Sequence, residues 1–437
     1  MKRTNSFCTR RQFLCNAAAV STLAATLPAP ALSADKSPNG KLPRFAVISD
    51  IHIENNRDEG AKVKVPRALK NLLSKTPIAD AVFVVGDLTQ SAKPEEFDQV
   101  AAMFADKTLV PEGIRPYFLL GNHDTGSGGK AIPLFTEKLK QPVHQYIEIK
   151  GYPFITVSMN DSDWKNPNCY NEESWLFLKE KLADAAVKYA GKPVFVFTHV
   201  PPSKTCYGSE RWGTEVFKSV LSQYPQAVVF SGHSHLPVGD PRSIHQDKFT
   251  AINDGSTTYS GVEAYEKLTI GIHPENNGKV TEGLIVTVLD SGSVDIERWD
   301  TYRNEKMLPD WTLAAPHDGS QFRYKNRSGL PAPAFAEDAK VAVTRIGEKG
   351  IAVTFPQAAD NEVVHHYLVE VVQDGKTAAL NRTFSQFYLN SDMPKTLTVR
   401  FKDLPVSLPY QIRVRAVDSF GNQSEPISAA FLSLNLP

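Results

Sequence analysis

Five short polar motifs could carry chemistry in this chain, because each stands where an apolar run ends. In chain order they are Asp50-Ile51-His52, Gly86-Asp87, Gly121-Asn122-His123-Asp124, the single His199, and Gly232-His233-Ser234-His235. Carboxylate, amide and imidazole groups are the ligands that hard or borderline divalent ions prefer. One such motif is more typical of a polar turn, but five in one chain favour a shared metal site.

The apolar runs before the motifs predict the strands that must position them. These runs are residues 45–48, 81–85, 117–120, 155–157, 194–197 and 227–230, and the fourth leads into Asn160-Asp161. Helix-like segments lie between them, at 66–73, from Pro94 onward, at 171–188 and at 213–221. This alternation indicates largely parallel strands covered on both faces. Ligand sites in such sheets collect at the carboxyl ends of the strands, so the polar residues should converge.

The five motifs, in this order, resemble those of the calcineurin-like metallophosphoesterase family. They span residues 50–235, a little under half of the chain. The resemblance implies an α/β four-layer sandwich, in which two mixed β-sheets are flanked by helices. It also implies metal-dependent hydrolysis of phosphoric esters. Runs at 249–252, 268–272 and 284–290 read as strands without intervening helices, as expected if the second sheet closes there.

Carried over motif by motif, the resemblance implies two divalent metal ions, with Mn, Fe, Zn or Co as candidates. The first ion would be held by Asp50, His52 and His235, the second by Asn122, His199 and His233, and Asp87 would bridge both. A hydroxide between the ions would attack phosphorus in line.

The same resemblance implies catalytic roles for two further residues. His123 would be the general acid for the leaving oxygen, and Asp124 would orient it and stabilise its charge. Simple electrostatic stabilisation of the phosphate by His123 is the competing role.

The substrate is less readable than the metal site. Gln90 stands three residues after Asp87 where the purple acid phosphatases have Tyr, and His52 is present where they have no His, so a purple enzyme is not expected. The sequence therefore predicts a phosphodiesterase or phosphatase acting on a small-molecule or headgroup phosphate ester. An exported phosphomonoesterase or nucleotidase, or a non-catalytic binding protein on this fold, are the alternatives. Candidates for the pocket rim are Asn160, Asp161, Trp164, Tyr170, Tyr207 and Tyr259.

The N-terminus predicts export. Residues 1–34 combine Arg10-Arg11, the apolar run 17–27 and a small-residue cleavage site, which resembles a twin-arginine signal peptide. We therefore expect a periplasmic or extracellular protein, and no other run is apolar enough to span a membrane. Removing the four basic residues of this segment leaves 44 basic against 48 acidic residues, a net charge of −4. This balance gives no sign of a nucleic-acid surface.

Cys169 and Cys206 remain once the signal segment is removed. Two cysteines in an exported protein make a disulfide plausible, and we expect the pair to brace the pocket rim, with two free thiols as the alternative.

The chain divides into a catalytic domain at 41–305, a proline-containing linker at 306–335 and a β-sandwich at 336–437. Alternating runs such as 351–355 and 410–416 resemble a fibronectin type III module, with Phe355 in place of the usual core Trp. Two roles are open for this module: docking a partner, or packing against the catalytic domain. We expect His365 and His366 to be surface residues, and His144, His245, His273 and His317 to be surface or packing residues.

Overall fold

The computed structural model describes residues 40–432 except 167–168, 266, 326, 328, 348 and 405–407. The expected signal peptide at 1–34 lies outside these residues. The described chain forms two compact units that divide between Lys325 and Asn326. Among the described residues, no helix is long and apolar enough to cross a membrane.

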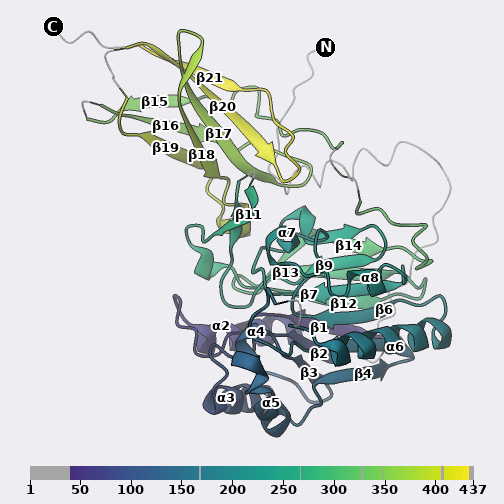
Figure 1. Cartoon of the computed structure of the whole chain (residues 1–437). Coiled ribbons are helices and arrows are strands. Elements are labelled where there is room, and N and C mark those ends of the chain that lie inside the picture. Colours follow the sequence, from purple (N-terminus) through teal and green to yellow (C-terminus); the bar gives the residue numbers. More distant parts are fainter. Residues whose placement is uncertain are drawn as a thin grey trace. The chain divides into compact units, whose positions relative to one another are not determined.

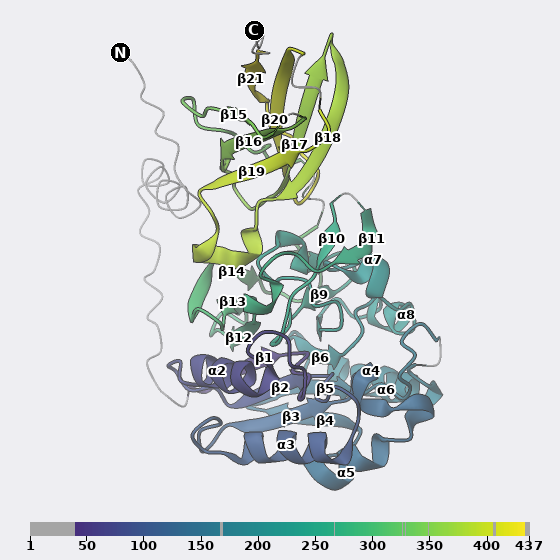
Figure 2. The same cartoon turned by 90° about the vertical axis from the view of Figure 1, so that its left-hand side faces the viewer.

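The first unit contains two six-stranded sheets (Figures 1 and 2). One sheet has the order β14-β13-β12-β1-β2-β3, from β1 (Arg44–Ile48), β2 (Ala81–Val85), β3 (Arg115–Leu119), β12 (Glu282–Val288), β13 (Val294–Asp300) and β14 (Glu305–Leu313). The other has the order β4-β5-β6-β7-β9-β8, from β4 (His144–Ile149), β5 (Tyr152–Val157), β6 (Val194–Thr198), β7 (Ala227–Ser231), β8 (Ile244–Gln246) and β9 (Thr250–Asn253). Both sheets are mixed, as expected: β1, β2 and β3 run parallel along one side of the first sheet, and β5, β6, β7 and β9 run parallel in the middle of the second.

Phenylalanine rings from both sheets form the core between them. Phe83 of β2 stacks on Phe197 of β6 with ring centroids 4.1 Å apart. Phe45 of β1 meets Phe154 and Phe195 edge-on, at 5.1 and 5.0 Å. Offset and edge-to-face contacts add specific geometry to the burial of large apolar surfaces. The two sheets are therefore locked face to face beneath the ends of their parallel strands.

Helices cover the two outer faces and complete four layers, as Figure 1 shows. On the first sheet, α2 (Ala61–Leu73), α3 (Pro94–Ala105) and α5 (Ile132–Leu139) share one apolar cluster with the outward side chains of β1 and β2. On the second, α6 (Glu172–Lys188) and α8 (Lys218–Leu221) do the same for β5, β6 and β7. Asn171 caps α6 by accepting a hydrogen bond from the Ser174 amide at 3.0 Å. The predicted four-layer sandwich is confirmed.

Two local expectations were wrong. Residues 213–221 are not one helix: α7 (Ser209–Trp212) ends before Gly213, and only α8 lies within the stretch. Residues 306–313 are not a linker, because β14 buries Met307, Trp311 and Leu313 at the edge of the first sheet. Pro309 interrupts the alternation of apolar and polar residues in this strand, so the sequence was interpreted as a linker. A proline is tolerated on an edge strand, and here the register shifts beside it.

A small hairpin of β10 (Val262–Ala264) and β11 (Lys267–Ile272) stands apart from both sheets. The run 268–272 is thus a strand, but it closes neither large sheet. The short helix α4 (Asn122–Thr125) follows β3 directly.

The second unit is an all-β sandwich with a three-stranded and a four-stranded sheet, ordered β15-β16-β19 and β18-β17-β20-β21. Its strands are β15 (Ala342–Arg345), β16 (Ile351–Pro356), β17 (Val364–Gln373), β18 (Lys376–Phe384), β19 (Thr396–Phe401), β20 (Tyr410–Asp418) and β21 (Ile427–Phe431). Phe355 packs on Tyr367 in the core, 5.0 Å between centroids. His365 and His366 are each 2% exposed, so their expected surface placement was wrong. Their Nδ1 atoms lie 3.0 Å apart, and the His365 ring packs on Phe387.

Candidate metal centre

Six side chains from four separate segments converge in the first unit. They form two groups that could each hold an ion: Asp50, His52, Asp87 and His235 in one, and Asp87, His199 and His233 in the other. Within each group, the ligand atoms all lie within 4.8 Å of one another. The seventh expected ligand, Asn122, places its Oδ1 3.2 Å from Nε2 of His199. The structure therefore brings together every residue that the sequence analysis assigned to metal binding.

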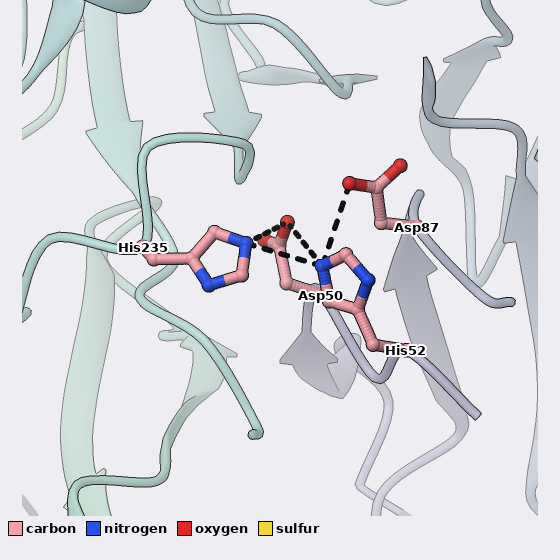
Figure 3. A group of neighbouring side chains, drawn as sticks. All are labelled: Asp50, His52, Asp87 and His235. Carbon is pink, nitrogen blue, oxygen red and sulfur yellow. Dashed lines mark hydrogen bonds and ion pairs between the residues drawn. The ribbon is translucent and has the colours of Figure 1, made fainter. Parts of the chain in front are cut away.

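The first group gathers around two imidazole Nε2 atoms and two carboxylates (Figure 3). Nε2 of His235 lies 3.0 Å from Oδ1 of Asp50 and 3.2 Å from Nε2 of His52. Nε2 of His52 lies 3.5 Å from Oδ2 of Asp87. Several ligand atoms thus surround one small volume.

Asp87 connects the two groups. Its Oδ2 is also 3.3 Å from Nε2 of His199, and its Oδ1 accepts a hydrogen bond from the His123 amide at 2.9 Å. The carboxylate is 2% exposed. One residue thus faces both groups, as a bridging ligand must.

The backbone turns sharply at most of these residues. Asp50, His52, Asp87, His233 and His235 have φ between 39° and 65°, in the left-handed region that non-glycine residues rarely adopt. Such strain clusters at functional sites, where the surrounding fold imposes it. Each turn comes directly after a strand, so the strand end and the strained turn together aim the side chain.

Hydrogen bonds at Nδ1, on the side of the imidazole away from the ligand group, hold two of the histidines in place. Nδ1 of His199 donates to the Val85 carbonyl at 2.9 Å, and Nδ1 of His235 donates to the Tyr259 carbonyl at 3.2 Å. When Nδ1 alone carries the proton, the lone pair of Nε2 faces the group. Metal-binding histidines almost always have such an outer partner.

Two buried atoms at the ligand groups have no hydrogen-bond partner among the described residues. Oδ1 of Asp50 accepts no well-directed hydrogen bond, although the carboxylate is completely buried, and Nε2 of His233 also has none. Oδ2 of Asp50, by contrast, accepts from the Ser49 hydroxyl at 2.6 Å and from the His233 amide at 3.1 Å. Unpaired buried ligand atoms beside satisfied ones fit a cation at this position.

The charges also favour a cation. Burial raises the pKa of Asp50, but its electrostatic and hydrogen-bond interactions with the neighbouring histidines, His235 first, outweigh burial, and the pKa falls to about 2. Burial lowers the pKa of His52 and of His233 to about 3. Burial also opposes protonation of His199, but Asp87 overrides it and raises that pKa to about 10. Two buried carboxylates therefore demand positive charge, while two neutral imidazoles offer lone pairs.

His123 and Asp124 are placed differently from the expected pair. Nδ1 of His123 donates to the Gln90 carbonyl at 2.8 Å. The Asp124 carboxylate instead accepts from the amides of Leu88, Thr89 and Gly121 at 2.8–3.0 Å. The expectation that Asp124 orients His123 was therefore wrong. Asp124 ties the Asp87 turn to the Asn122 turn and acts on His123 only through its charge.

A pocket of about 340 Å³ opens beside the groups. From the metal centre it is lined by Asp87, Asn122, His123, His233, Ser234 and His235, and further out by Trp164, Arg211, Trp212, Tyr259, Gly261, Gly271, Ile272 and His273. Of the expected rim residues, Trp164 and Tyr259 are part of this lining. Tyr170 and Tyr207 are only 2% and 4% exposed, and the Tyr170 hydroxyl accepts a hydrogen bond from the Val200 amide at 3.1 Å.

Sequence reasoning missed Arg211, Trp212 and His273 as pocket residues. His273 was expected to be a surface or packing residue, but it lines the pocket. Trp212 is there because Gly271 of β11 leaves room for its ring: a methyl group on Gly271 would overlap the indole. The adjacency of Arg211 and Trp212 was a visible signal, but nothing local placed α7 beside the β10–β11 hairpin.

Cys169 and Cys206 are both free thiols, so the expected disulfide was wrong. They are 0% and 2% exposed within the apolar cluster between the second sheet and α6. Burial raises the pKa of Cys169 to about 11 and that of Cys206 to about 12. They serve as packing residues rather than as a brace of the rim.

Comparison with known proteins places this site in a family context. A search of curated proteins finds none that matches the chain. Among solved structures, a purple acid phosphatase, PPD1, from seeds of yellow lupin (Lupinus luteus) is 14% identical, with a TM-score of 0.43 over 63% of this chain and 54% of that one. This chain thus spans about half the length of that neighbour.

Two fibronectin type III domains are also similar. That of human fibronectin type III domain containing protein 3 is 19% identical, with a TM-score of 0.17 over 26% of this chain and 95% of that one. That of human contactin 1 is 22% identical, with a TM-score of 0.17 over 26% and 96%. Residues 43–237, which include all seven expected ligands and His123, match the family model described as calcineurin-like phosphoesterase. The segment that supplies the metal centre is therefore similar, from end to end, to the calcineurin-like phosphoesterases.

Proposed function

We propose that this protein hydrolyses phosphoric esters at a centre of two divalent metal ions. The observation that carries the proposal is Asp87, whose carboxylate faces both ligand groups at once. Asp50, His52 and His235 would hold one ion, and Asn122, His199 and His233 the other. Two such ions polarise phosphoryl oxygens and lower the pKa of bound water.

The chain's own groups provide the rest of the reaction. His123 lines the pocket next to Asn122, and its Nδ1 is fixed by the Gln90 carbonyl, so Nε2 is the atom left to give a proton to the leaving oxygen. Burial lowers the pKa of His123, but the charge of Asp87, this hydrogen bond and the charge of Asp124 together raise it above the ordinary value. A raised pKa favours the protonated form of the ring, which a general acid requires.

Aromatic side chains shield the ligand histidines from the open side. The Trp164 ring meets His233 at 4.8 Å between centroids, and the Tyr259 ring meets His235 at 4.3 Å. Excluding water strengthens electrostatic interactions inside a site. A phosphoryl group would thus enter between these two rings.

The chemistry leaves the ester class open between phosphodiester and phosphomonoester, since the same metal centre serves both. A nucleotidase is one form of the monoester alternative. A non-catalytic binding protein is less well supported, because every expected ligand and His123 are retained and converge. We further propose export guided by residues 1–34, and a docking role for the second unit.

A metal-by-substrate experiment tests the function. The ions are removed and Mn, Zn, Fe or Co is restored, metal content is measured, and chromogenic mono- and diesters are assayed. We expect two ions per chain and hydrolysis that depends on them. Asp87→Asn should lower both metal content and hydrolysis by at least tenfold, whereas Asp98→Asn, an exposed residue paired with Lys138, should change neither. Full metal content and activity in Asp87→Asn would reject the bridged centre.

Secretion can be checked separately. The protein should appear in the periplasmic or extracellular fraction, and Arg10→Lys with Arg11→Lys should leave it inside the cell. Unchanged export in that double variant would contradict a twin-arginine route.

A further inference from the structure

The outer half of the pocket contains features that the hydrolysis of a phosphoryl group does not use. The volume of about 340 Å³ is within the range of sites that hold a whole small ligand. The expected metal ligands and His123 account for only part of its lining. The rest of the lining includes Arg211, Trp212, Tyr259 and His273, which we call the outer pocket.

Two guanidinium groups border this outer pocket, and each stacks on an aromatic ring of the pocket wall. Arg57 lies over the Tyr259 ring with its Cζ 4.1 Å from the centroid. Arg211 lies over the Trp212 ring at 5.1 Å. Stacking on the ring holds a guanidinium in place, while its N–H groups, which lie in the guanidinium plane, stay available to a ligand.

Neither arginine forms an ion pair with a carboxylate of the described residues. Nη1 of Arg57 contacts Nε2 of His273 at 3.3 Å, and Nη1 of Arg211 donates to the Thr269 carbonyl at 2.6 Å. Each partner is neutral in these contacts and uses one of the five donors of a guanidinium. Two other stacked arginines of the first unit differ: Arg67 and Arg303 stack on Tyr302, but Glu59 neutralises the first and Asp300 the second.

A continuous series of contacts links Arg57 to the metal centre. The Tyr259 ring beneath Arg57 packs on His235, and the Tyr259 carbonyl accepts the His235 Nδ1 proton. Arg57 is therefore one ring removed from a metal ligand. An anionic group bound there would belong to the same small molecule as the phosphoryl group at the metals.

We propose that the outer pocket selects phosphate esters whose leaving group carries a second anionic group, and that Arg57 and Arg211 bind that group. The inference rests on the proposed function for the first anion, but the arginines lie outside the metal ligands. A carboxylate or a second phosphate has the planar or triangular oxygen pattern that a guanidinium fork recognises. The aromatic platforms would contact the organic part between the two anions.

The test separates binding from hydrolysis. Metal-loaded protein is titrated with phenylphosphonate, 4-carboxyphenylphosphonate and 1,4-phenylenebisphosphonate, which are not hydrolysed, and binding is followed by calorimetry. The same comparison is made for hydrolysis of phenyl phosphate and 4-carboxyphenyl phosphate. The two doubly anionic phosphonates distinguish a carboxylate from a phosphate as the preferred second group.

We expect the wild-type protein to bind at least one doubly anionic ligand about tenfold more tightly than phenylphosphonate, since a charge-assisted contact contributes on this scale. Arg57→Met and Arg211→Met keep apolar stems and should each reduce that preference about three- to tenfold, without changing phenylphosphonate binding. Arg67→Met is the matched control, because it removes a stacked but already neutralised arginine, and it should leave the preference intact.

The outcomes are distinct. Equal binding of all three phosphonates, or an unchanged preference in both variants, would overturn the second-anion subsite even if phenyl phosphate is hydrolysed. Selective phosphonate binding without hydrolysis of any ester would instead support the subsite and reject the proposed enzymatic function. A parallel loss with phenylphosphonate would show that the arginines act on the phosphoryl group itself, and would also overturn the inference.

Discussion

Nδ1 of His123 donates to the carbonyl of Gln90 across 2.8 Å, so a backbone group, rather than a neighbouring carboxylate, holds this imidazole. Gln90 lies three residues beyond Asp87 on the same loop. The loop that supplies the shared carboxylate therefore also sets the direction of the proposed proton donor.

His123→Ala should reveal that role through its dependence on the leaving group. A good leaving group needs little protonation, so hydrolysis of a 4-nitrophenyl ester should fall only a few-fold. Hydrolysis of an alkyl ester should fall by about 10²–10⁴-fold, the usual contribution of a general acid. Steady-state kinetics on both esters checks this, with metal content as the control. An equal loss on both substrates would assign His123 to electrostatic stabilisation of phosphate.

Asp124→Asn should destabilise the fold near the site. The carboxylate accepts hydrogen bonds from three backbone amides, and from the Thr89 hydroxyl at 2.8 Å. The side-chain NH₂ group of Asn would face some of these N–H and O–H donors and could not accept from them. Leaving buried amides unpaired costs roughly 1–3 kcal/mol. Denaturant unfolding measures this loss. Asp106→Asn is the control, because that carboxylate is exposed and the Thr108 amide from which it accepts a hydrogen bond at 2.8 Å lies at the surface. Equal stability in the two variants would contradict the bracing role.

Gly121→Ala should displace the shared carboxylate. A methyl group at this position would overlap the Asp87 carboxylate and its backbone amide, neither of which is the free end of a long side chain. We expect both ions to bind at least tenfold more weakly, in the range seen when groups that orient ligands are altered. Metal titration checks this. Gly329→Ala, where a methyl group meets nothing within 4 Å, should bind like the wild type.

Glu282→Gln should change how stability depends on pH. Burial raises the pKa of Glu282 to about 8, from an ordinary 4.5, while its Oε2 accepts the Val238 amide at 2.9 Å. Between these values the unfolded chain releases a proton that the folded chain keeps, so the free energy of unfolding falls as pH rises. The slope is at most about 1.4 kcal/mol per pH unit. Glu282→Gln has no proton to lose at this position. Its free energy of unfolding, relative to that of the wild type, should therefore rise from pH 5 to pH 8.

Unfolding measured at both pH values tests the sign. The exposed Glu95→Gln should follow the wild type. A difference between Glu282→Gln and the wild type that is constant with pH would show that Glu282 does not keep its proton in the fold.

The site was more predictable from sequence than the pocket around it. Asp50, Asp87 and Asn122 follow apolar runs, and strand ends converge by topology, so their meeting could be expected without coordinates. The His123 ring lies beside that of His52, at 4.7 Å between centroids. Its adjacency to Asp124 in sequence suggested a side-chain contact that the α4 turn does not make. The direction of a side chain depends on φ and ψ, which the pattern of residue types does not specify.

The missed residues share one physical reason. Arg211 and Trp212 of α7 and His273, which follows β11, line the pocket because of tertiary packing, such as that of Trp212 against Gly271. Neither periodicity nor turn chemistry encodes such a contact. β14 was missed for another reason. Pro309 interrupts its alternating pattern in the sequence, but an edge strand tolerates a proline. The disulfide was predicted because the protein was expected to be exported to an oxidising compartment. In the structure, Cys169 and Cys206 are free thiols that pack within an apolar cluster.

The left-handed turns at Asp50, His52, Asp87, His233 and His235 have a thermodynamic consequence. Each such residue stores on the order of 1 kcal/mol or more of conformational energy. Bound ions that hold these turns in place would compensate for that energy, so releasing the metals would also let the loops relax. Metal occupancy and local order at the rim of the two sheets would then rise and fall as a single cooperative event.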